Sequence, residues 1–121
     1  MVMQKFIENG RVRLLGVSDI NILGNCCDVF LDTFPTVTGY AALESFAKGV
    51  PVFTRECINL KSYRKNRIEE LIFASDDELI NSLYITSENR MHYDRLSVLS
   101  KNFITKLLDL KQISKSILSQ I

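Results

Sequence analysis

The chain has 121 residues, of which 46% are hydrophobic and 24% are charged. This length and composition suit one globular domain and exclude a disordered chain, a collagen or a coiled-coil array. Fifteen Lys and Arg residues stand against 14 Asp and Glu residues, and the resulting net charge of +1 is too small to favour a nucleic acid or a membrane surface as the partner.

The apolar stretches and the cysteines indicate the cellular compartment of the protein. The longest stretches, such as Val50–Phe53, are far shorter than the roughly 20 apolar residues that cross a bilayer, and the N-terminus lacks the apolar core of a secretory signal. The three cysteines include the adjacent Cys26 and Cys27, a spacing that suits neither a disulfide set nor a metal site. We therefore expect a cytoplasmic protein with no membrane span, no bound metal, and buried, reduced thiols.

The first predicted elements are two strands. Arg11–Val17 follows an Asn-Gly turn signal and carries four apolar residues, which indicates a short strand. Asp28–Asp32 places three apolar strand formers between two acids, and this pattern predicts a buried parallel strand.

A helix and a further strand come next. Tyr40–Lys48 is predicted to be a helix because Leu43 and Phe46 belong to one apolar face, and Gly49 stands where a left-handed residue often ends a helix. Val50–Thr54 is the following strand. A strand, a helix and a strand in this order form a βαβ unit, so the sequence predicts an α/β fold with a parallel sheet and flanking helices.

The second half of the chain is mainly helical. Ile68–Ala74 is predicted to add a strand, and Ser75 is a good N-cap with Glu78 at capping-box spacing. Helical periodicity then continues to the C-terminus and is strongest over Tyr93–Leu110. We expect a single domain over residues 1–121, with a helical C-terminal segment from about residue 76 to 121. The apolar face of this segment is expected to belong to the core, with a contact to an absent domain or a dimer interface as the alternatives.

The loop after the strand Asp28–Asp32 is the best candidate for a binding site. Ligands of α/β sheets bind outside the carboxyl ends of the strands, and this loop leads directly into a helix. Thr38 or Gly39 is placed to cap that helix, and the amides of Tyr40, Ala41 and Ala42 point outward at the positive end of its dipole. A phosphate or diphosphate suits this arrangement, although a Thr-Gly pair is also an ordinary helix start.

Glu44 lies one turn further along the same predicted helix. Its carboxylate can accept two hydrogen bonds from a ribose diol next to the phosphates. The alternative is an ion pair with Lys48, four residues on, at a solvated surface. Asp32 also has a purely structural interpretation, in which its side chain only caps the following loop.

Other polar residues point less clearly to a site. His92 is the only histidine and is expected to lie at the surface. Four basic residues are expected to form a solvated segment, with phosphate binding as the alternative: Lys61, Arg64, Lys65 and Arg67.

One segment carries a family resemblance. Residues Asp28–Thr54, with the sequence DVFLDTFPTVTGYAALESFAKGVPVFT, closely resemble the nucleotide-sugar-binding segment of GT-B glycosyltransferases. The wording is most similar to the O-linked N-acetylglucosamine transferase (SPINDLY-like) group. Arg11–Val17 also resembles a strand of that family, and residues 68–81 resemble a later segment. The resemblance implies a Rossmann-like domain, namely the C-terminal half of a GT-B fold.

The resemblance also implies roles for individual residues. Four residues at the loop and helix start would contact the donor diphosphate: Thr38, Gly39, Tyr40 and Ala41. Glu44 would bind the ribose, and Val17 and Ser18 would lie near the base. Some relatives have His or Thr where this chain has Tyr40 and Ala41, so only backbone contacts are carried over at these two positions.

The function that the resemblance implies is transfer of a hexosyl or N-acetylhexosaminyl group from a nucleoside-diphosphate sugar, with a UDP-sugar as the expected donor, to an acceptor protein or glycan. The helix amides would stabilise charge on the leaving diphosphate without a metal or another cofactor. The catalytic base is not identified, because relatives take acceptor-side residues from an N-terminal Rossmann-like domain. We therefore expect this chain to act with such a domain or with a partner chain.

Two alternatives belong to other functional classes. The chain can be a non-catalytic nucleotide-binding or assembly module. It can also be a receiver-type signalling domain, with Asp32 as the phospho-acceptor and Thr54 as the switch residue. The receiver reading is weakened because only 31 residues precede Asp32, too few for the two βα units that a receiver places before its acceptor.

Overall fold

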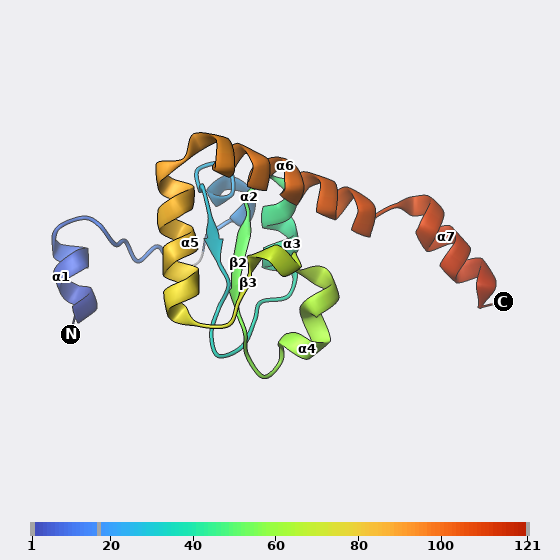
Figure 1. Ribbon diagram of the computed structural model, residues 1–121, viewed down its shortest axis with the longest axis horizontal. Coiled ribbons are helices and arrows are strands. Elements are labelled where there is room, and N and C mark those ends of the chain that lie inside the picture. The colour runs from blue at the N-terminus through green and yellow to red at the C-terminus, as the bar shows by residue number, and fades with distance from the viewer. Residues whose placement is uncertain (1, 17, 121) are drawn as a thin grey trace.

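The computed structural model describes residues 2–16 and 18–120. Figure 1 shows a central body from which the two ends of the chain extend in opposite directions. The helices and strands, in chain order, are α1 (Val2–Glu8), α2 (Ile20–Leu23), β1 (Phe30–Leu31), α3 (Tyr40–Ala47), β2 (Val52–Arg55), α4 (Leu60–Tyr63), the 3-10 helices η1 (Arg64–Asn66) and η2 (Glu69–Leu71), β3 (Ile72–Phe73), α5 (Asp76–Glu88), α6 (Arg90–Leu107) and α7 (Leu110–Ser119).

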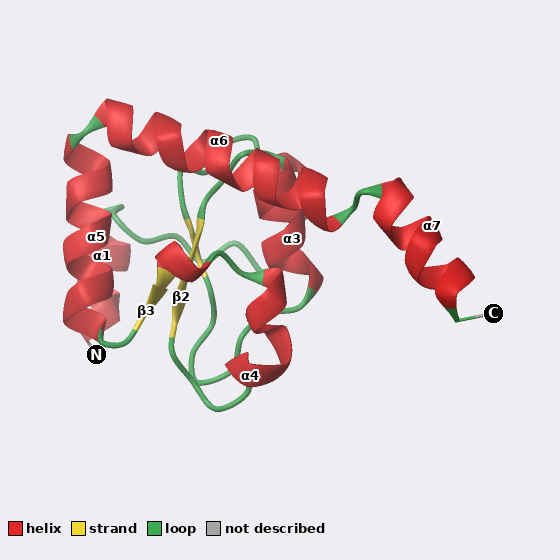
Figure 2. Ribbon diagram, turned by 45° about the vertical axis from the view of Figure 1, so that its right-hand side comes forward, coloured by secondary structure: helices red, strands yellow, loops and turns green. Residues whose placement is uncertain are grey.

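The centre of the body is a small parallel sheet with the strand order β1-β2-β3. Leu31 pairs with Phe53, and Thr54 pairs with Ile72. Helices α3 and α5 lie on opposite sides of the sheet, and α6 crosses over both of them (Figure 2). The predicted α/β class, the parallel sheet with flanking helices and the βαβ unit β1-α3-β2 are therefore confirmed.

The core forms where the helices meet the sheet. Phe46 of α3 and Phe53 of β2 are completely buried. The ring of Phe46 lies 5.1 Å from that of Phe103 on α6, and the ring of Phe53 lies 5.4 Å from that of Phe73 on β3. Such tilted contacts between aromatic rings add to the energy of apolar burial. The first contact joins α3 to α6, and the second joins β2 to β3.

Three helix ends follow local rules. Gly49 has a φ of +75°, and the amide of the next residue, Val50, donates to the Ser45 carbonyl at 2.9 Å, as expected of a left-handed residue that ends a helix. The Ser75 hydroxyl accepts from the Glu78 amide at 3.2 Å, which confirms the predicted N-cap. Asn89, which the sequence analysis did not single out, caps α6 by accepting from the His92 amide at 3.1 Å.

Two predictions for the first third of the chain are wrong. Residues 11–16 pair with no described strand, and Gly16 has a φ of +67°. The predicted strand Arg11–Val17 is therefore not formed there; Val17 itself lies outside the described residues. Cys26 and Cys27 are exposed rather than buried, because they lie in the loop between α2 and β1, although both thiols are free.

The C-terminal apolar face is divided between core and surface. Leu96 and Ile104 of α6 are buried as predicted. Helix α7 instead extends away from the body (Figure 1), and its Ile117 and Leu118 are exposed. The sequence pattern shows which side of a helix is apolar, but whether another element covers that side depends on the tertiary structure. None of the described helices combines the length and the apolar character needed to cross a membrane.

Candidate functional site

A buried carboxylate organises the carboxyl end of the sheet. Asp32 comes directly after β1, and its side chain is 0% exposed. Oδ1 accepts hydrogen bonds from the Thr38 amide and hydroxyl, both at 2.8 Å, and from the Thr33 amide at 3.1 Å. Oδ2 accepts from the Thr54 hydroxyl at 3.1 Å and from Arg67 Nε at 2.8 Å. Both carboxylate oxygens are therefore fully used by groups of the chain itself.

Arg67 is the charged partner of this carboxylate. Its side chain is 1% exposed, and its other two guanidinium nitrogens donate to the carbonyl oxygens of Asn66 and Thr38. Burial alone would raise the pKa of Asp32, but the hydrogen bonds from Arg67 and Thr38 outweigh this effect and hold that pKa below its ordinary value. Asp32 is thus ionised and forms a neutral pair with Arg67.

This pair holds the loop that precedes α3. The amide and the hydroxyl of Thr38 both donate to Asp32, and Arg67 donates to the carbonyl oxygen of Thr38. A second attachment comes from Asn59, whose Oδ1 accepts from the Val37 amide at 3.0 Å. The conformation of the loop is therefore set by groups from β1, β2 and the segment after β2.

The loop presents the N-terminus of α3 without a side-chain cap. Gly39 is the N-cap residue and supplies no capping side chain. Thr38, the other predicted cap, uses its hydroxyl on Asp32 instead, so this part of the prediction is corrected. A Cβ atom on Gly39 would meet no other atom within 4 Å, and Tyr40 is 82% exposed. The first amides of α3, including that of Ala41, thus remain available as hydrogen-bond donors to an anion.

Glu44 lies on the same side of α3 as Tyr40, because the two residues are four positions apart. Its side chain is exposed and forms no hydrogen bond or ion pair with another described residue. The alternative partner Lys48 donates instead to Asn25 Oδ1 at 3.2 Å. The alternative, a surface ion pair between Glu44 and Lys48, is therefore not formed, and the carboxylate remains available to a ligand.

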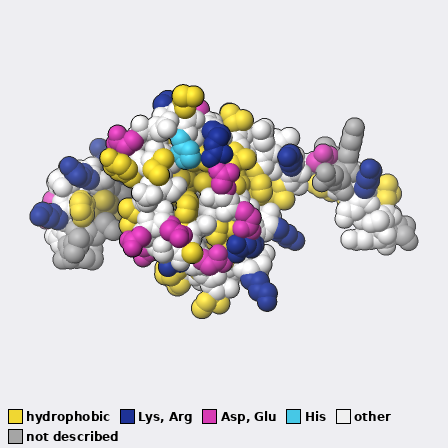
Figure 3. Space-filling model, viewed as in Figure 1, with side chains coloured by type: hydrophobic (Ala, Val, Ile, Leu, Met, Phe, Trp, Pro, Cys, Tyr) yellow, Lys and Arg dark blue, Asp and Glu magenta, His cyan; other side chains and the backbone are white. Residues whose placement is uncertain are grey.

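The basic segment divides into one buried and three exposed residues. Arg67 belongs to the buried cluster, so its assignment to a solvated segment is wrong. Arg64 is exposed and pairs with Glu56 at 2.9 Å and Glu69 at 2.6 Å. Lys61 and Lys65 are exposed as predicted. The visible face in Figure 3 shows basic and acidic side chains mixed rather than one basic patch.

Asp32 caps the following loop, as the alternative interpretation of this residue held, but its contacts with Thr54 and Arg67 were not predicted. Leu31 and Phe53 are partners in the parallel sheet, and Asp32 and Thr54 are the residues that follow them. The proximity of Asp32 and Thr54 could therefore have been inferred from the alignment of the two strands. Arg67 lies 35 residues after Asp32, and no local pattern marks it as the partner of Asp32.

His92, expected at the surface, is half-buried at the start of α6.

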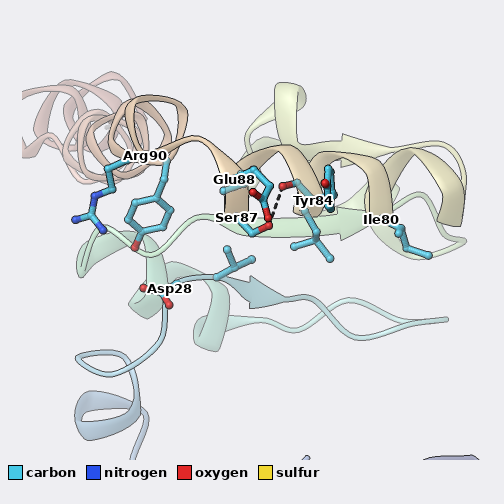
Figure 4. Close-up of a pocket in the computed structure, with 10 residues that line it drawn as sticks. Asp28, Ile80, Tyr84, Ser87, Glu88 and Arg90 are labelled. Atoms are coloured by element: carbon cyan, nitrogen blue, oxygen red, sulfur yellow. Dashed lines mark hydrogen bonds between the residues drawn. The ribbon is translucent and has the colours of Figure 1, made fainter. Parts of the chain in front are cut away.

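A separate cavity of about 730 Å³ lies between the start of β1 and helices α5 and α6 (Figure 4). Asp28, Val29, Ile80 and Tyr84 are among its lining residues, and none of the predicted site residues is. This cavity is therefore separate from the candidate site at α3. Among the described residues, no three His, Cys, Asp or Glu side chains come together to hold a metal ion.

Comparison with family models, with curated proteins and with solved structures found no significant match to this chain.

Proposed function

We propose that this chain is the donor-binding part of a glycosyltransferase, that is, a Rossmann-like C-terminal half of a GT-B enzyme that binds a nucleoside-diphosphate sugar at the start of α3. One observation carries the proposal. The uncapped N-terminus of α3 lies at the carboxyl end of a parallel strand, and the buried pair of Asp32 and Arg67 holds the loop that presents it. Parallel sheets bind nucleotides at such positions, and helix N-termini bind phosphates.

The proposed roles follow from the chemistry of each group. The backbone amides of Gly39, Tyr40 and Ala41 bind the diphosphate and stabilise the negative charge that builds on it as the sugar leaves. The side chain of Thr38 keeps the loop in place through Asp32. The exposed Glu44 carboxylate accepts hydrogen bonds from the ribose hydroxyls. A UDP-sugar is the proposed donor, and a protein or glycan is the proposed acceptor.

Two further features belong to the same proposal. The acceptor and the general base are supplied outside the α3 site, from an N-terminal Rossmann-like domain or a partner chain. The activity is cytoplasmic, because exposed free thiols such as those of Cys26 and Cys27 persist in a reducing compartment.

The surroundings of Asp32 argue against a receiver domain. A phospho-acceptor aspartate must be reachable by a phosphoryl donor, whereas the carboxylate of Asp32 is buried and accepts five hydrogen bonds from the chain. Phosphorylation there would break the pair with Arg67 and leave a buried charge without its partner.

Isothermal titration of the chain with UDP, and separately with GDP, tests the proposal. We expect one of them to bind, and we expect Glu44→Ala to weaken binding by about 1.5 to 3 kcal/mol, roughly 10- to 150-fold, as the loss of charged hydrogen bonds should. Glu8→Ala, an exposed substitution on α1, is the matched control and should leave affinity unchanged. A folded chain that binds neither nucleotide would contradict the proposal, and binding without sugar transfer once the acceptor half is supplied would favour the non-catalytic module.

A further inference from the structure

The outer edge of β1 has no partner in the described sheet, because β1 stands at the end of the strand order. The amide of Phe30 donates to the carbonyl of Pro51, just before β2, and the amide of Asp32 donates to the carbonyl of Phe53 in β2, each at 3.0 Å. Successive backbone N–H groups of a strand point to opposite edges. The amide of Leu31, between them, therefore points away from β2, toward the open edge.

The space beside this edge is lined by apolar side chains. Leu31 is 54% exposed, and Ile80 and Tyr84 of α5 are exposed as well. The cavity between α5 and the start of β1 is lined by Ile80, Tyr84 and Val29. Figure 4 shows Asp28 across this space from the labelled residues of α5. The apolar side of α5 thus lines the space beside the start of β1.

The chain carries a segment with the properties that this space requires. Residues 11–15 have the sequence RVRLL; residues 12–15 belong to no helix, strand or turn, and Leu14 is 79% exposed. The amides of Arg11 and Val12 bond to the end of α1, and residues 13–16 donate no backbone hydrogen bond to another described residue. The segment has the apolar content of a strand but lacks the neighbour that a strand needs.

Length and charge both permit this segment to reach the open edge. Thirteen residues, including helix α2, separate Leu15 from Val29, and a crossover between parallel strands needs about 10 to 12 residues. The segment carries Arg11 and Arg13, while Asp28 and Glu88 line the cavity beside the edge. The cavity's own cation, Arg90, already pairs with Asp94 at 3.2 Å.

We propose that residues 11–15 close onto the outer edge of β1 as a fourth parallel strand of the same chain, with α2 as the crossover helix. The closed form pairs the Leu31 amide and covers Leu31 and the apolar side of α5. The 13-residue connection keeps the segment close to its own edge, which favours closure within one chain over exchange between two copies. This inference is independent of the proposed nucleotide site.

Amide hydrogen exchange measured by NMR tests the proposal. Phe30 and Asp32, which bond to β2, are internal references that stay protected in either form. We expect the Leu31 amide to exchange at least about tenfold more slowly than an open amide, and trypsin to cut after Arg13 at least about tenfold more slowly than in the unfolded chain. Leu14→Asp should abolish the protection of Leu31 while leaving Phe30 and Asp32 protected. Ile58→Asp, at a residue that is 96% exposed, is the matched control and should change none of these.

Two outcomes would overturn the proposal. Exchange of the Leu31 amide at the open rate, together with rapid cutting after Arg13 in the folded protein, would show that the edge stays unpaired. Protection of Leu31 that rises with protein concentration and accompanies a dimer would show that a second copy supplies the strand.

Discussion

Nε of Arg67 donates to Oδ2 of Asp32 over 2.8 Å, and the two side chains are 1% and 0% exposed although 35 residues separate them in the sequence. This single contact joins the end of β1 to the segment after β2. Because Arg67 also donates to the carbonyl oxygen of Thr38, the same contact fixes the loop that leads into α3.

Removal of the cation should be strongly destabilising. Arg67→Ala leaves the Asp32 carboxylate buried without its charged partner, so we expect the free energy of unfolding to fall by about 3 to 5 kcal/mol in urea denaturation. Arg64→Ala is the control, because Arg64 also pairs with two carboxylates but at an exposed position, and its loss should cost far less stability. Equal losses in the two variants would contradict the role assigned to the buried pair.

The same pair should make stability depend on acid pH. The carboxyl of Asp32 has a pKa below its ordinary value of 3.8 in the folded chain. A carboxyl of this kind contributes stability that is complete above the unfolded pKa and is lost as the pH falls through the folded pKa.

Urea midpoints measured from about pH 5 downward should therefore fall with pH in the wild type. The fall should be smaller in Asp32→Asn, which has no charge to lose at this position. Glu69 and Glu70 also have lowered pKa values, each mainly through a hydrogen bond from an arginine, Arg64 and Arg95 respectively, and they titrate in both proteins. Parallel curves for the two proteins would show that Asp32 does not contribute to the pH dependence.

Gly49 should tolerate a side chain less well than Gly10. Both have a positive φ, +75° and +79°, which costs an alanine roughly 1 to 2 kcal/mol. A Cβ on Gly49 would also lie 2.7 Å from Cε of Lys101 and 2.8 Å from Oγ of Ser97, whereas a Cβ on Gly10 meets nothing within 4 Å. Thermal unfolding should therefore show a larger loss of stability for Gly49→Ala than for Gly10→Ala, and the opposite order would contradict the packing of α6 against the end of α3.

The start of α5 should depend on its capping residue. Ser75→Ala removes the hydroxyl that accepts from the Glu78 amide, and we expect a loss of about 1 kcal/mol in the free energy of unfolding. Ser114→Ala, at an exposed position inside α7, should be neutral or slightly stabilising, because alanine is the better helix former. A neutral Ser75→Ala would mean that the cap contributes nothing to stability.

The elements that could be predicted from the sequence are those defined by neighbouring residues. The apolar spacing within Tyr40–Lys48, the glycine after it and the Ser75 cap are local signals, and each appears in the structure where it was predicted. The βαβ unit follows from the order of such signals. Gly39, Tyr40 and Ala41 could be assigned to a helix start for the same reason, since the first amides of any helix lack partners.

The sequence by itself determined the α/β class, the position of α3 and the residues at its N-terminus, because helix periodicity, caps and strand alternation depend on side chains a few residues apart. Only the tertiary structure decided that Arg67 pairs with Asp32, that Thr38 supports the loop instead of capping the helix, and that residues 11–16 lie beside no strand. Each of these depends on which distant segments meet when the core closes, and burial then decides whether a charged or apolar side chain is paired, packed or left in solvent.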